Sequence, residues 1–365
     1  MEKTDPIRIL IVGMHDRIGG VETFLMNYYR NIDRNEVVFD FISTYNALCF
    51  EDEIKELGGK IYNICSEKKN PIRYCKQLSS ILKENNYNII HINMLSAANI
   101  LPVLVAKNQK IKHIIIHSHN SNTPSGLLRK VLNSLNKTFL CLGTDFFACS
   151  ELAGEWLFGK ELLKKHNLTI IHNAIECEKY SYNEETRQKV RKELKLEKKF
   201  VVGHIGRFSY QKNHEFLIDI FYEIQKQKAE SILLLIGEGE LETSIRKKVL
   251  DLGIEDEVVF LGITNKVEEY LQAMDVFVLP SRFEGLPVIG VEAQASGIEC
   301  FFSDNITTEA KINDNVSFIS LKESPKEWAD KILKKNHKRV QGKLDKYDIK
   351  TNAKILQMKY EKMEK

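Results

Sequence analysis

Two glutamates bracket the stretch EGLPVIGVE, residues 284–292, at a spacing that suggests ligand binding. The stretch follows the apolar run DVFVLP, and Pro287 suits the first turn of a helix, so a helix is predicted to begin near Leu286. On a continuous helix the two carboxylates would lie about 12 Å apart along the axis and roughly 80° apart around it. They are therefore predicted to contact different ends of one elongated ligand, and neither an acid–base pair nor a shared metal site is expected.

The amino end of this predicted helix suits an anionic ligand, because its outward N–H groups attract negative charge. It is formed by Gly285, Leu286, Pro287 and Val288. A carboxylate can accept both hydroxyls of a cis-diol, so the arrangement predicts a sugar at Glu284, phosphates at the helix end and a ribose at Glu292. The alternatives are a capping carboxylate at Glu284 and a solvated helix face at Glu292.

Two further loops follow apolar strands and precede helices. The stretch GHIGRFSYQKNH contains Gly206, Arg207 and Lys212, whose planar guanidinium and compact ammonium suit a diphosphate. The stretch GMHDRIGGVE contains Gly20 in a glycine pair that would let the backbone approach a ligand closely. It lacks the G-x-G-x-x-G pattern, so a nicotinamide cofactor is disfavoured. The alternatives are solvated loop cations and a plain tight turn.

Short β-branched runs alternate with amphipathic helical stretches along most of the 365 residues, which indicates parallel sheets covered on both faces. The predicted strands are residues 7–13, 37–43, 60–64, 88–93, 112–118, 145–150, 168–173, 200–206, 231–237, 257–262 and 275–280. A polar stretch at 177–186 interrupts the series. We therefore predict two doubly wound, Rossmann-like α/β domains, residues 1–178 and 179–345, that face a central cleft.

The final residues, 346–365, are predicted to form an amphipathic helix. Its apolar side consists of Ile349, Ala353, Leu356 and Tyr360. No apolar run reaches the ~18 residues of a membrane span, and the amino terminus lacks the pattern of a cleavable signal. The seven cysteines include no C-x-x-C pair, which argues against a disulfide framework or a zinc site and favours a cytoplasmic location.

Positive charge is concentrated in one segment. Residues 57–140 contain twelve Lys and Arg residues and two acidic ones, a net charge of +10, whereas the whole chain carries +3. The excess predicts a surface that faces something anionic. Residues 126–140 are predicted to form a helix whose apolar face covers the sheet. The cations expected to bind an anionic membrane surface are Lys107, Lys110, Lys112, Arg129, Lys130 and Lys137.

Taken in order, these motifs resemble the family-4 retaining glycosyltransferases of the GT-B fold. The resemblance rests on GGVE after the first strand, on GR with a following lysine, and on the two glutamates separated by seven residues. The stretches ACSELAGEWLFG, IHNAIE and SDNITTEA also resemble members that build bacterial capsular polysaccharides and exopolysaccharides. The similarity covers nearly the whole chain, and the GT-B fold implies that the C-terminal helix crosses back to the first domain.

The resemblance implies a role for each matching residue. Glu292 would hold the donor ribose, and Glu284 with the amides of 285–288 would contact the transferred sugar. Arg207 and Lys212 would bind the diphosphate and offset the charge of the leaving group, and Gly20 would approach the β-phosphate. Members also use a histidine at the end of a strand in the first domain. His117 and His119 both fit, and His119 is favoured because it lies further into the loop.

The implied reaction moves a hexose or N-acetylhexosamine, with retention, from a nucleotide-diphosphate sugar to a lipid-linked or saccharide acceptor. A UDP-linked donor is expected, with no cofactor, and the missing D-x-D triplet predicts metal-independent transfer. Nucleic acid is not an expected partner, and the oligomeric state stays open. The expected location is cytoplasmic, peripheral on the inner face of the cell membrane. The alternatives are a nucleotide-sugar 2-epimerase of the same fold and a non-catalytic partner subunit.

One stretch departs from the family pattern. Members often carry Gly-x-Pro-Val after the helix with the two glutamates, whereas this chain has Gly297-Ile298-Glu299-Cys300. An acid therefore occupies a position that is usually an apolar strand residue. The predicted ribose site is unaffected, but contacts to the donor base are left open.

Overall fold

The computed structural model describes residues 5–120, 126–340 and 344–365. The chain forms two compact units: Met1–Ala174 with Lys346–Lys365, called the N-terminal unit, and Ile175–Asp345, called the C-terminal unit. The predicted boundary at residue 178 lies four residues beyond the observed one. The reason is that helix α7 (Cys177–Tyr180) packs on α11 and α12 of the C-terminal unit.

The N-terminal unit is built on a seven-stranded parallel sheet in the order β3-β2-β1-β4-β5-β6-β7. Helices cover both faces of the sheet, so every position of the central strands β2 and β4 is buried. The strands are β1 (Ile7–Val12), β2 (Val37–Ser43), β3 (Ile61–Asn63), β4 (Ile89–Met94), β5 (His113–Ser118), β6 (Asp145–Ala148) and β7 (Leu168–Ile170). All seven lie within the predicted runs, apart from Met94 at the end of β4.

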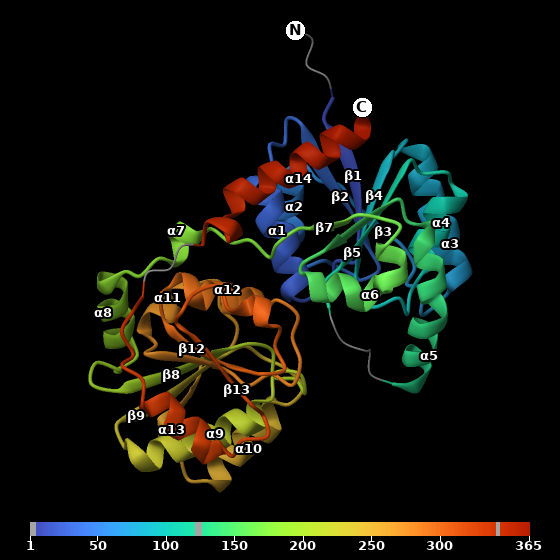
Figure 1. Ribbon diagram of the computed structural model, residues 1–365. Helices are drawn as coiled ribbons and strands as arrows, with labels where there is room; N and C mark the ends of the chain where they lie inside the picture. The colour runs from blue at the N-terminus through green and yellow to red at the C-terminus, as the bar shows by residue number, and fades with distance from the viewer. Residues whose placement is uncertain (1–4, 121–125, 341–343) are drawn as a thin grey trace. The chain divides into compact units, whose positions relative to one another are not determined.

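The helices of this unit alternate with the strands (Figure 1). They are α1 (Gly20–Asn31), α2 (Glu51–Glu56), α3 (Pro71–Glu84), α4 (Leu101–Asn108), α5 (Leu127–Asn136) and α6 (Glu151–Leu163), with a 3-10 helix, η1 (Lys137–Leu142), after α5. Asn70 begins α3 by accepting a hydrogen bond from the Arg73 N–H. Ser150 begins α6 in the same way, accepting from the Ala153 N–H.

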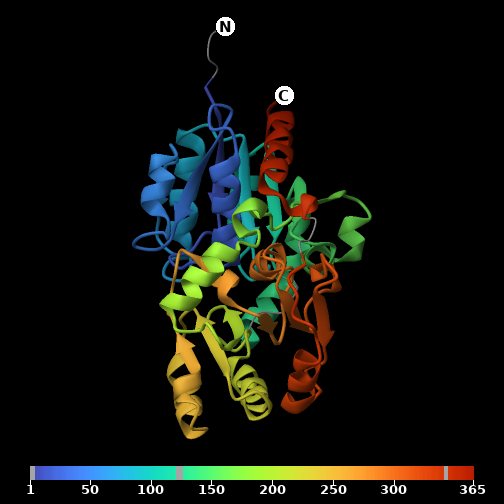
Figure 2. The same cartoon turned by 90° about the vertical axis from the view of Figure 1, so that its left-hand side faces the viewer.

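The C-terminal helix α14 (Ile349–Glu364) belongs to the N-terminal unit and packs against α1, β1 and β2 (Figures 1 and 2). Asp348 caps its amino end by accepting a hydrogen bond from the Thr351 N–H. The four residues predicted on its apolar side, Ile349, Ala353, Leu356 and Tyr360, are all buried. A period of 3.6 residues was sufficient to predict this face.

The C-terminal unit contains a six-stranded parallel sheet in the order β10-β9-β8-β11-β12-β13. The strands are β8 (Phe200–Ile205), β9 (Ser231–Ile236), β10 (Val258–Phe260), β11 (Val276–Leu279), β12 (Glu299–Ser303) and β13 (Val316–Ile319). The last two were not predicted. Both are short, and β12 opens with Glu299, which pairs with Lys335 at an Oε1–Nζ distance of 3.4 Å. Glu299, the acid that differs from the family pattern, therefore lies at the amino end of its strand, away from the carboxyl ends where ligands bind.

Helices also cover both faces of this sheet. They are α7 (Cys177–Tyr180), α8 (Glu184–Glu193), α9 (His214–Gln227), α10 (Glu242–Asp251), α11 (Val267–Ala273), α12 (Val288–Ala295) and α13 (Pro325–Leu333), with short 3-10 turns at Glu255–Glu257 and Thr308–Ala310. A further 3-10 turn, Asp345–Tyr347, spans the boundary between the two units. Ser324 and Glu327 form a reciprocal capping box at α13. No helix within the described residues is both long and apolar enough to cross a membrane.

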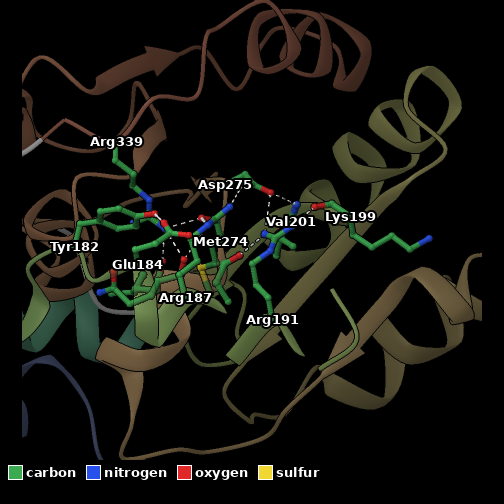
Figure 3. Close-up of polar contacts among 12 residues, drawn as sticks. Tyr182, Glu184, Arg187, Arg191, Lys199, Val201, Met274, Asp275 and Arg339 are labelled. Carbon is green, nitrogen blue, oxygen red and sulfur yellow. Dashed lines mark hydrogen bonds and ion pairs between the residues drawn. The ribbon is translucent and has the colours of Figure 1, made fainter. Parts of the chain in front are cut away.

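A cluster of arginines closes the amino edge of the C-terminal sheet around Asp275, the residue before β11 (Figure 3). Its carboxylate pairs with Arg187 at 2.5 Å and with Arg191 at 3.2 Å, and it accepts a hydrogen bond of 2.7 Å from the Val201 N–H. Arg339 joins the cluster mainly through main-chain carbonyls, and burial lowers its pKa to about 10. It donates to the carbonyl oxygens of Leu271, Gln272, Met274 and Ser296.

Candidate active site

Helix α12 begins at Val288, two residues later than predicted. Pro287 is the residue before the helix, with an extended backbone (φ −71°, ψ 124°), and its carbonyl accepts the first helical hydrogen bonds from Gly290 and Val291. The residue before the first turn contributes only its carbonyl to the helical hydrogen bonds. A proline is therefore tolerated there as well as in the first turn, because its missing N–H is not needed. Glu284 therefore lies in the β11–α12 loop, and the 12 Å spacing predicted for a continuous helix does not apply.

Glu284 pairs with a second predicted residue, Lys212. The Lys212 Nζ lies 2.7 Å from Glu284 Oε1, and the two side chains are only 15% and 11% exposed. Ser281, which is fully buried, donates a 3.3 Å hydrogen bond to the same carboxylate oxygen. Lys212 belongs to the β8–α9 loop and Glu284 to the β11–α12 loop, so neighbouring strands of the sheet bring the two residues together at its carboxyl edge.

The loop that carries Glu284 is fixed by side chains from neighbouring loops. The Arg282 N–H donates to the Gln211 carbonyl at 2.8 Å. Four side chains donate to carbonyls of the loop: Gln211 to Phe283, Asn213 to Pro280, Ser303 to Ser281, and Asn305 to Arg282. A reactive carboxylate needs such support, because a loop that moves by about an ångström loses its alignment with a substrate.

Glu292 is buried in the middle of α12 rather than solvated, so the alternative of a solvated helix face is wrong. Its Oε1 accepts a 2.8 Å hydrogen bond from the Tyr180 hydroxyl, which comes from α7. Burial raises the pKa of Glu292 to about 7, and the charge of Glu268 adds to this, whereas the Tyr180 hydrogen bond and Lys179 lower it. The sequence alone did not indicate that Tyr180 would form a hydrogen bond with Glu292, which lies 112 residues later in the chain.

Arg207 contacts a different carboxylate. Its Nη2 lies 3.0 Å from Glu240 Oε2, and both side chains are 55% exposed. Gly206 leaves room for Lys212, because a Cβ built at Gly206 would lie 3.0 Å from the lysine Cε. The β9–α10 loop, with sequence GEGE, packs closely against Gly206. A Cβ on Gly237, whose φ is +131°, would lie 2.3 Å from the Gly206 carbonyl oxygen. Gly237 and Gly239, which follow a predicted strand, could have indicated this loop, but the sequence analysis did not identify it.

In the N-terminal unit Gly20 is the first residue of α1, and a Cβ built there meets no protein atom within 4 Å. Packing therefore does not require glycine at this position. The nearby Glu22 is buried and accepts hydrogen bonds from the His15 backbone N–H at 3.0 Å and from its Nδ1 at 2.9 Å. This pairing shapes the β1–α1 loop and was not predicted.

His119 follows β5, and its Nε2 lies 2.8 Å from Asn93 Oδ1. The other end of the Asn93 amide donates to the Val12 carbonyl at 3.1 Å, which fixes the orientation of the amide. His119 Nε2 therefore carries the proton, and Nδ1 is left as a hydrogen-bond acceptor. Burial lowers the pKa of His119 to about 3, so the ring is neutral at physiological pH.

His117 lies one layer deeper. It is fully buried, and its Nδ1 lies 3.0 Å from Nε2 of His91, whose Nδ1 lies 2.6 Å from the hydroxyl of Tyr360 on α14. The His117 and His119 rings are 4.0 Å apart between centroids. A polar chain in the core thus runs from α14 to the side chain beneath His119. Sequence reasoning had treated Tyr360 only as an apolar contact.

The carboxyl ends of β2 and β3 open into a polar pocket that the sequence analysis did not identify. Its lining includes Thr44, Tyr45, Asn46, Asn63, Ser66, Lys69, Arg73 and Gln77. Amide, hydroxyl and cationic groups of this kind suit sugar hydroxyls and phosphate oxygens. The position of the two loops after strands was the available signal. Among the described residues, no group of three His, Cys, Asp or Glu residues could hold a metal ion.

The helix predicted over residues 126–140 exists as α5 followed by η1, but its expected packing is wrong. Most of its predicted apolar face is exposed, whereas Asn133 is buried and Leu132 is half-buried. The exposed side chains are Leu127, Leu128, Val131, Leu135 and Phe139. The reason is that Asn133 and Asn136 form hydrogen bonds to the loop after β4. Lys137, counted among the membrane-facing cations, instead donates to the Trp156 carbonyl and lies over its ring.

Two doubly wound parallel units, each with polar loops at the carboxyl edge of its sheet, define a class of two-domain α/β proteins that bind ligands at those edges. Sequence comparison gives the family. The family model "Glycosyltransferase Family 4" matches residues 18–179, and "Glycosyl transferases group 1" matches residues 185–354. EpsF of Bacillus subtilis (strain 168) is 31% identical over 325 residues, which cover 87% of this chain and 84% of EpsF. The chain belongs to the family-4 glycosyltransferases.

Other relatives agree with this membership, and a solved structure shares the fold. The capsular polysaccharide biosynthesis glycosyltransferase CapH of Staphylococcus aureus is 25% identical over 341 residues, covering 90% of each chain. An Escherichia coli UDP-Gal:alpha-D-GlcNAc-diphosphoundecaprenol alpha-1,3-galactosyltransferase is 26% identical over 62% of this chain and 60% of its own length. The Anabaena protein HepE, crystallised with UDP, has 16% identity and a TM-score of 0.72 over 97% of this chain and 95% of HepE, and shows the shared GT-B fold.

Proposed function

We propose that this chain transfers a hexose or an N-acetylhexosamine from a UDP-linked sugar to a lipid-linked or saccharide acceptor during synthesis of a cell-surface polysaccharide. Membership of the glycosyltransferase family supports the reaction class. The name of CapH supports the pathway, and the name of the Escherichia coli relative supports a UDP-sugar donor and an undecaprenol-diphosphate-linked acceptor. The UDP bound to HepE supports the same nucleotide.

The observation that carries the proposal is the ion pair between Lys212 and Glu284 at the carboxyl edge of the C-terminal sheet. Lysine is a mobile point charge that can move from one anion to another. In the proposed mechanism Lys212 leaves Glu284 for the donor diphosphate, and Arg207 adds a second cation. Glu284 then accepts hydroxyl groups of the transferred sugar. The two cations offset the negative charge that develops on the departing UDP.

The rest of the donor is assigned along α12. The backbone of Gly206 and of residues 285–288 lies near the phosphates and the sugar, because the amino end of a helix favours anions. Glu292 accepts the ribose hydroxyls, and Tyr180 orients its carboxylate through the 2.8 Å hydrogen bond. A hydroxyl donor from the ribose would stabilise the ionised form of Glu292, whose pKa lies at about 7 without it.

The N-terminal unit is assigned the acceptor and part of the donor contact. His119 offers Nδ1 to a hydroxyl of the transferred sugar, and Gly20 leaves space for the β-phosphate. The polar pocket with Lys69 and Arg73 takes the acceptor, where the two cations suit a diphosphate-linked sugar. We further propose that the transfer retains configuration and needs no metal ion, and that the protein binds the cytoplasmic face of the membrane through basic residues of 57–140.

A donor panel tests this function directly. The protein would be incubated with UDP-glucose, UDP-galactose and their N-acetylated forms, together with a diphosphoundecaprenol-linked sugar or a short-chain analogue of it. Mass spectrometry should show one added hexose or N-acetylhexosamine, NMR of the product should show the donor anomer, and EDTA should leave the rate unchanged. Release of UDP with a 2-epimerised sugar would instead identify an epimerase, and no turnover with any donor would favour a non-catalytic subunit.

A further inference from the structure

A buried histidine with an unpartnered nitrogen lies beside Lys212. His204, in β8, is fully buried, and its Nε2 has no hydrogen-bond partner among the described residues. A Cβ built on Gly206 would lie 3.3 Å from this Nε2 and 3.0 Å from the Lys212 Cε. The nitrogen and the end of the lysine stem therefore border the same small space, which exists because residue 206 has no side chain.

The hydrogen bond on the other side of the His204 ring determines which nitrogen carries the proton. His204 Nδ1 lies 2.8 Å from the carbonyl oxygen of Val278 in β11. A carbonyl can only accept, so Nδ1 carries the proton and Nε2 presents a lone pair. Burial lowers the pKa of His204 to about 3, the Val278 hydrogen bond opposes this, and the charge of Lys212 adds to it. The ring is therefore a neutral hydrogen-bond acceptor next to a cation.

Aromatic contacts fix the plane of the His204 ring. Phe277 of β11 lies parallel to it at 6.3 Å between ring centroids, and His214, the first residue of α9, meets it edge to face at 4.6 Å. His214 in turn stacks on Phe208 at 4.1 Å. Burial holds the pKa of His214 well below its usual range, so this second ring is also neutral. The position of the His204 Nε2 is thus fixed by ring packing as well as by the hydrogen bond of Nδ1.

The backbone that carries Lys212 is fixed, so the ammonium moves only by rotation of its side chain. The Lys212 N–H donates to the Ser209 carbonyl at 3.2 Å, and the Asn213 side chain donates to the Pro280 carbonyl at 3.1 Å. The Nζ lies 2.7 Å from Glu284 Oε1. An ammonium has three N–H donors, so a lysine that exchanges a carboxylate for a phosphate still has donors to place. A fixed protein acceptor for one of them would keep the lysine aligned with its ligand.

We propose that His204 is a positioning residue for Lys212: when the ammonium leaves Glu284 for the donor diphosphate, it turns over Gly206 and donates one N–H to His204 Nε2. The inference rests on the proposed function, in which Lys212 offsets the charge of the departing UDP. A neutral acceptor suits this step, because it orients the ammonium without cancelling its charge, whereas a second carboxylate would cancel it. A protonated ring would repel the lysine, which is why a buried, neutral histidine fits the position.

Two amide substitutions separate the two nitrogens of His204. Asparagine can keep a donor near the position of Nδ1 but has no group near Nε2, whereas glutamine can place its carbonyl oxygen near Nε2. His204→Asn should lower kcat by about tenfold, the loss expected for a hydrogen bond to a charged group, and His204→Gln should retain most of the parent's kcat. The reverse order, with His204→Asn active and His204→Gln impaired, would assign the histidine to the Val278 hydrogen bond alone and overturn the proposal.

A double-mutant cycle shows whether His204 acts through Lys212. His204→Asn should lower kcat by about tenfold in the parent but by less than about twofold in Lys212→Ala, where the interaction is already absent. Equal fold losses in the two backgrounds would make the effect structural and contradict the proposal. The matched control is His214→Phe, which keeps an aromatic ring against Phe208 and should turn over like the parent. A loss in this control larger than that in His204→Asn would move the acceptor to His214.

The nitrogen chemical shifts of the imidazole rings test the proposal in the unsubstituted protein. With histidine labelled by an NMR-active nitrogen isotope, His204 should show a protonated Nδ1 and an unprotonated Nε2; its signals are those lost in His204→Asn or His204→Gln. On saturation with UDP the Nε2 signal should move upfield, as it does when the lone pair accepts a hydrogen bond. This change should be absent in Lys212→Ala. An unchanged Nε2 signal with UDP bound, or a change of the parent size in Lys212→Ala, contradicts the proposal.

Failure of this inference can be distinguished from failure of the proposed function. If the parent neither binds UDP nor transfers sugar, the proposed function fails and the role of His204 fails with it. If Lys212→Ala turns over like the parent, the assignment of the cation is wrong. If the parent transfers sugar and Lys212→Ala is impaired while His204→Asn matches the parent, the function stands and the role of His204 is wrong.

Discussion

Strand β11 has an ion-pair site at each end, and the two sites differ in how firmly their cations are bound. At the amino end Asp275 contacts Arg187 and Arg191, each of which also donates two hydrogen bonds to main-chain carbonyls, those of residues 199 and 272–274 (Figure 3). At the carboxyl end Glu284 contacts Lys212 at 2.7 Å, and Arg207 pairs with the half-exposed Glu240. The first set of cations has many fixed acceptors, and the second has few.

The number of fixed acceptors explains what each site can do. Arg187 and Arg191 each donate three hydrogen bonds to fixed protein oxygens, so the Asp275 cluster fastens α8 to the sheet. An ammonium paired with one carboxylate can exchange that carboxylate for a phosphate at little cost, because one charge-assisted contact replaces another. The number of fixed acceptors therefore distinguishes structural cations from substrate-binding cations better than burial does. Four predictions test this distinction between the two ends of β11.

The largest expected effect is on stability at the Asp275 end. Asp275→Asn should lower the free energy of unfolding by about 3–5 kcal/mol, because it leaves two partly buried guanidinium groups without their counterion. Urea denaturation followed by circular dichroism measures this. The UDP affinity of the protein that remains folded should be unchanged. Glu240→Gln, the matched change at the exposed pair, should cost no more than about 1 kcal/mol, and equal losses in the two variants would remove the distinction between the sites.

The next effect is on turnover at the carboxyl end. Lys212→Ala should lower kcat by about 10²–10³-fold, since it removes a cation that offsets charge on the leaving diphosphate. Its loss of unfolding free energy should be smaller than that of Asp275→Asn. Glu284→Gln should reduce kcat more than it reduces UDP affinity measured by calorimetry. A Lys212→Ala enzyme with the parent's kcat would show that this ion pair is structural, like its counterpart at the other end of β11.

A third effect concerns Glu292, whose pKa of about 7 exceeds the ordinary carboxyl value. Between about pH 4.5 and about pH 7 the Glu292 carboxyl stays protonated in the folded protein but ionises in the unfolded chain. Its contribution to the free energy of unfolding therefore falls progressively as pH rises through this range. Ribose hydroxyls favour the ionised carboxylate, so UDP affinity should rise with pH through about 7, with proton release detected by calorimetry in buffers of different ionisation enthalpy. The charged groups that act on it are Glu268 and Lys179, with Tyr180 as its donor.

The control for this pH dependence is Glu292→Gln. It should weaken UDP binding by about 1.5–3 kcal/mol, the value of a hydrogen bond to a charged group, and should remove the proton release. Tyr180→Phe should move the rise in affinity to higher pH, because the lost hydrogen bond had lowered the carboxyl pKa. Proton release of the parent size in Glu292→Gln would assign the titration to another residue and sink the ribose assignment.

The smallest effect is expected at Arg207. Arg207→Ala should change the free energy of unfolding by no more than about 1 kcal/mol, because its pair with Glu240 is exposed and screened by solvent. It should lower kcat/KM, yet by less than Lys212→Ala, since the neighbouring lysine still contacts the diphosphate. Steady-state kinetics at low and high salt would check this. A kinetic loss as large as that of Lys212→Ala would make Arg207 the principal cation of the site.

Local features of the sequence were sufficient for the framework. Apolar runs predicted eleven strands, among them β1, β2 and β8, and the period of the tail predicted the buried face of α14. Strand and helix periods depend on residues close in sequence, so they can be recognised in one chain. The rule that ligands bind after the carboxyl ends of strands then located Lys212 and Glu284 in loops that proved to be neighbours.

Tertiary contacts determined the orientation of helices and the electrostatics of buried groups, which sequence periodicity does not specify. An amphipathic pattern shows that α5 has two faces, but the hydrogen bonds of Asn133 and Asn136 to Ala97 determine which one is turned outward. The pKa of Glu292 depends on burial and on Tyr180, a residue 112 positions away in the chain. The physical reason is the same in both cases: periodicity is a property of neighbouring residues, whereas orientation and electrostatics depend on partners that only the folded chain brings within hydrogen-bonding distance.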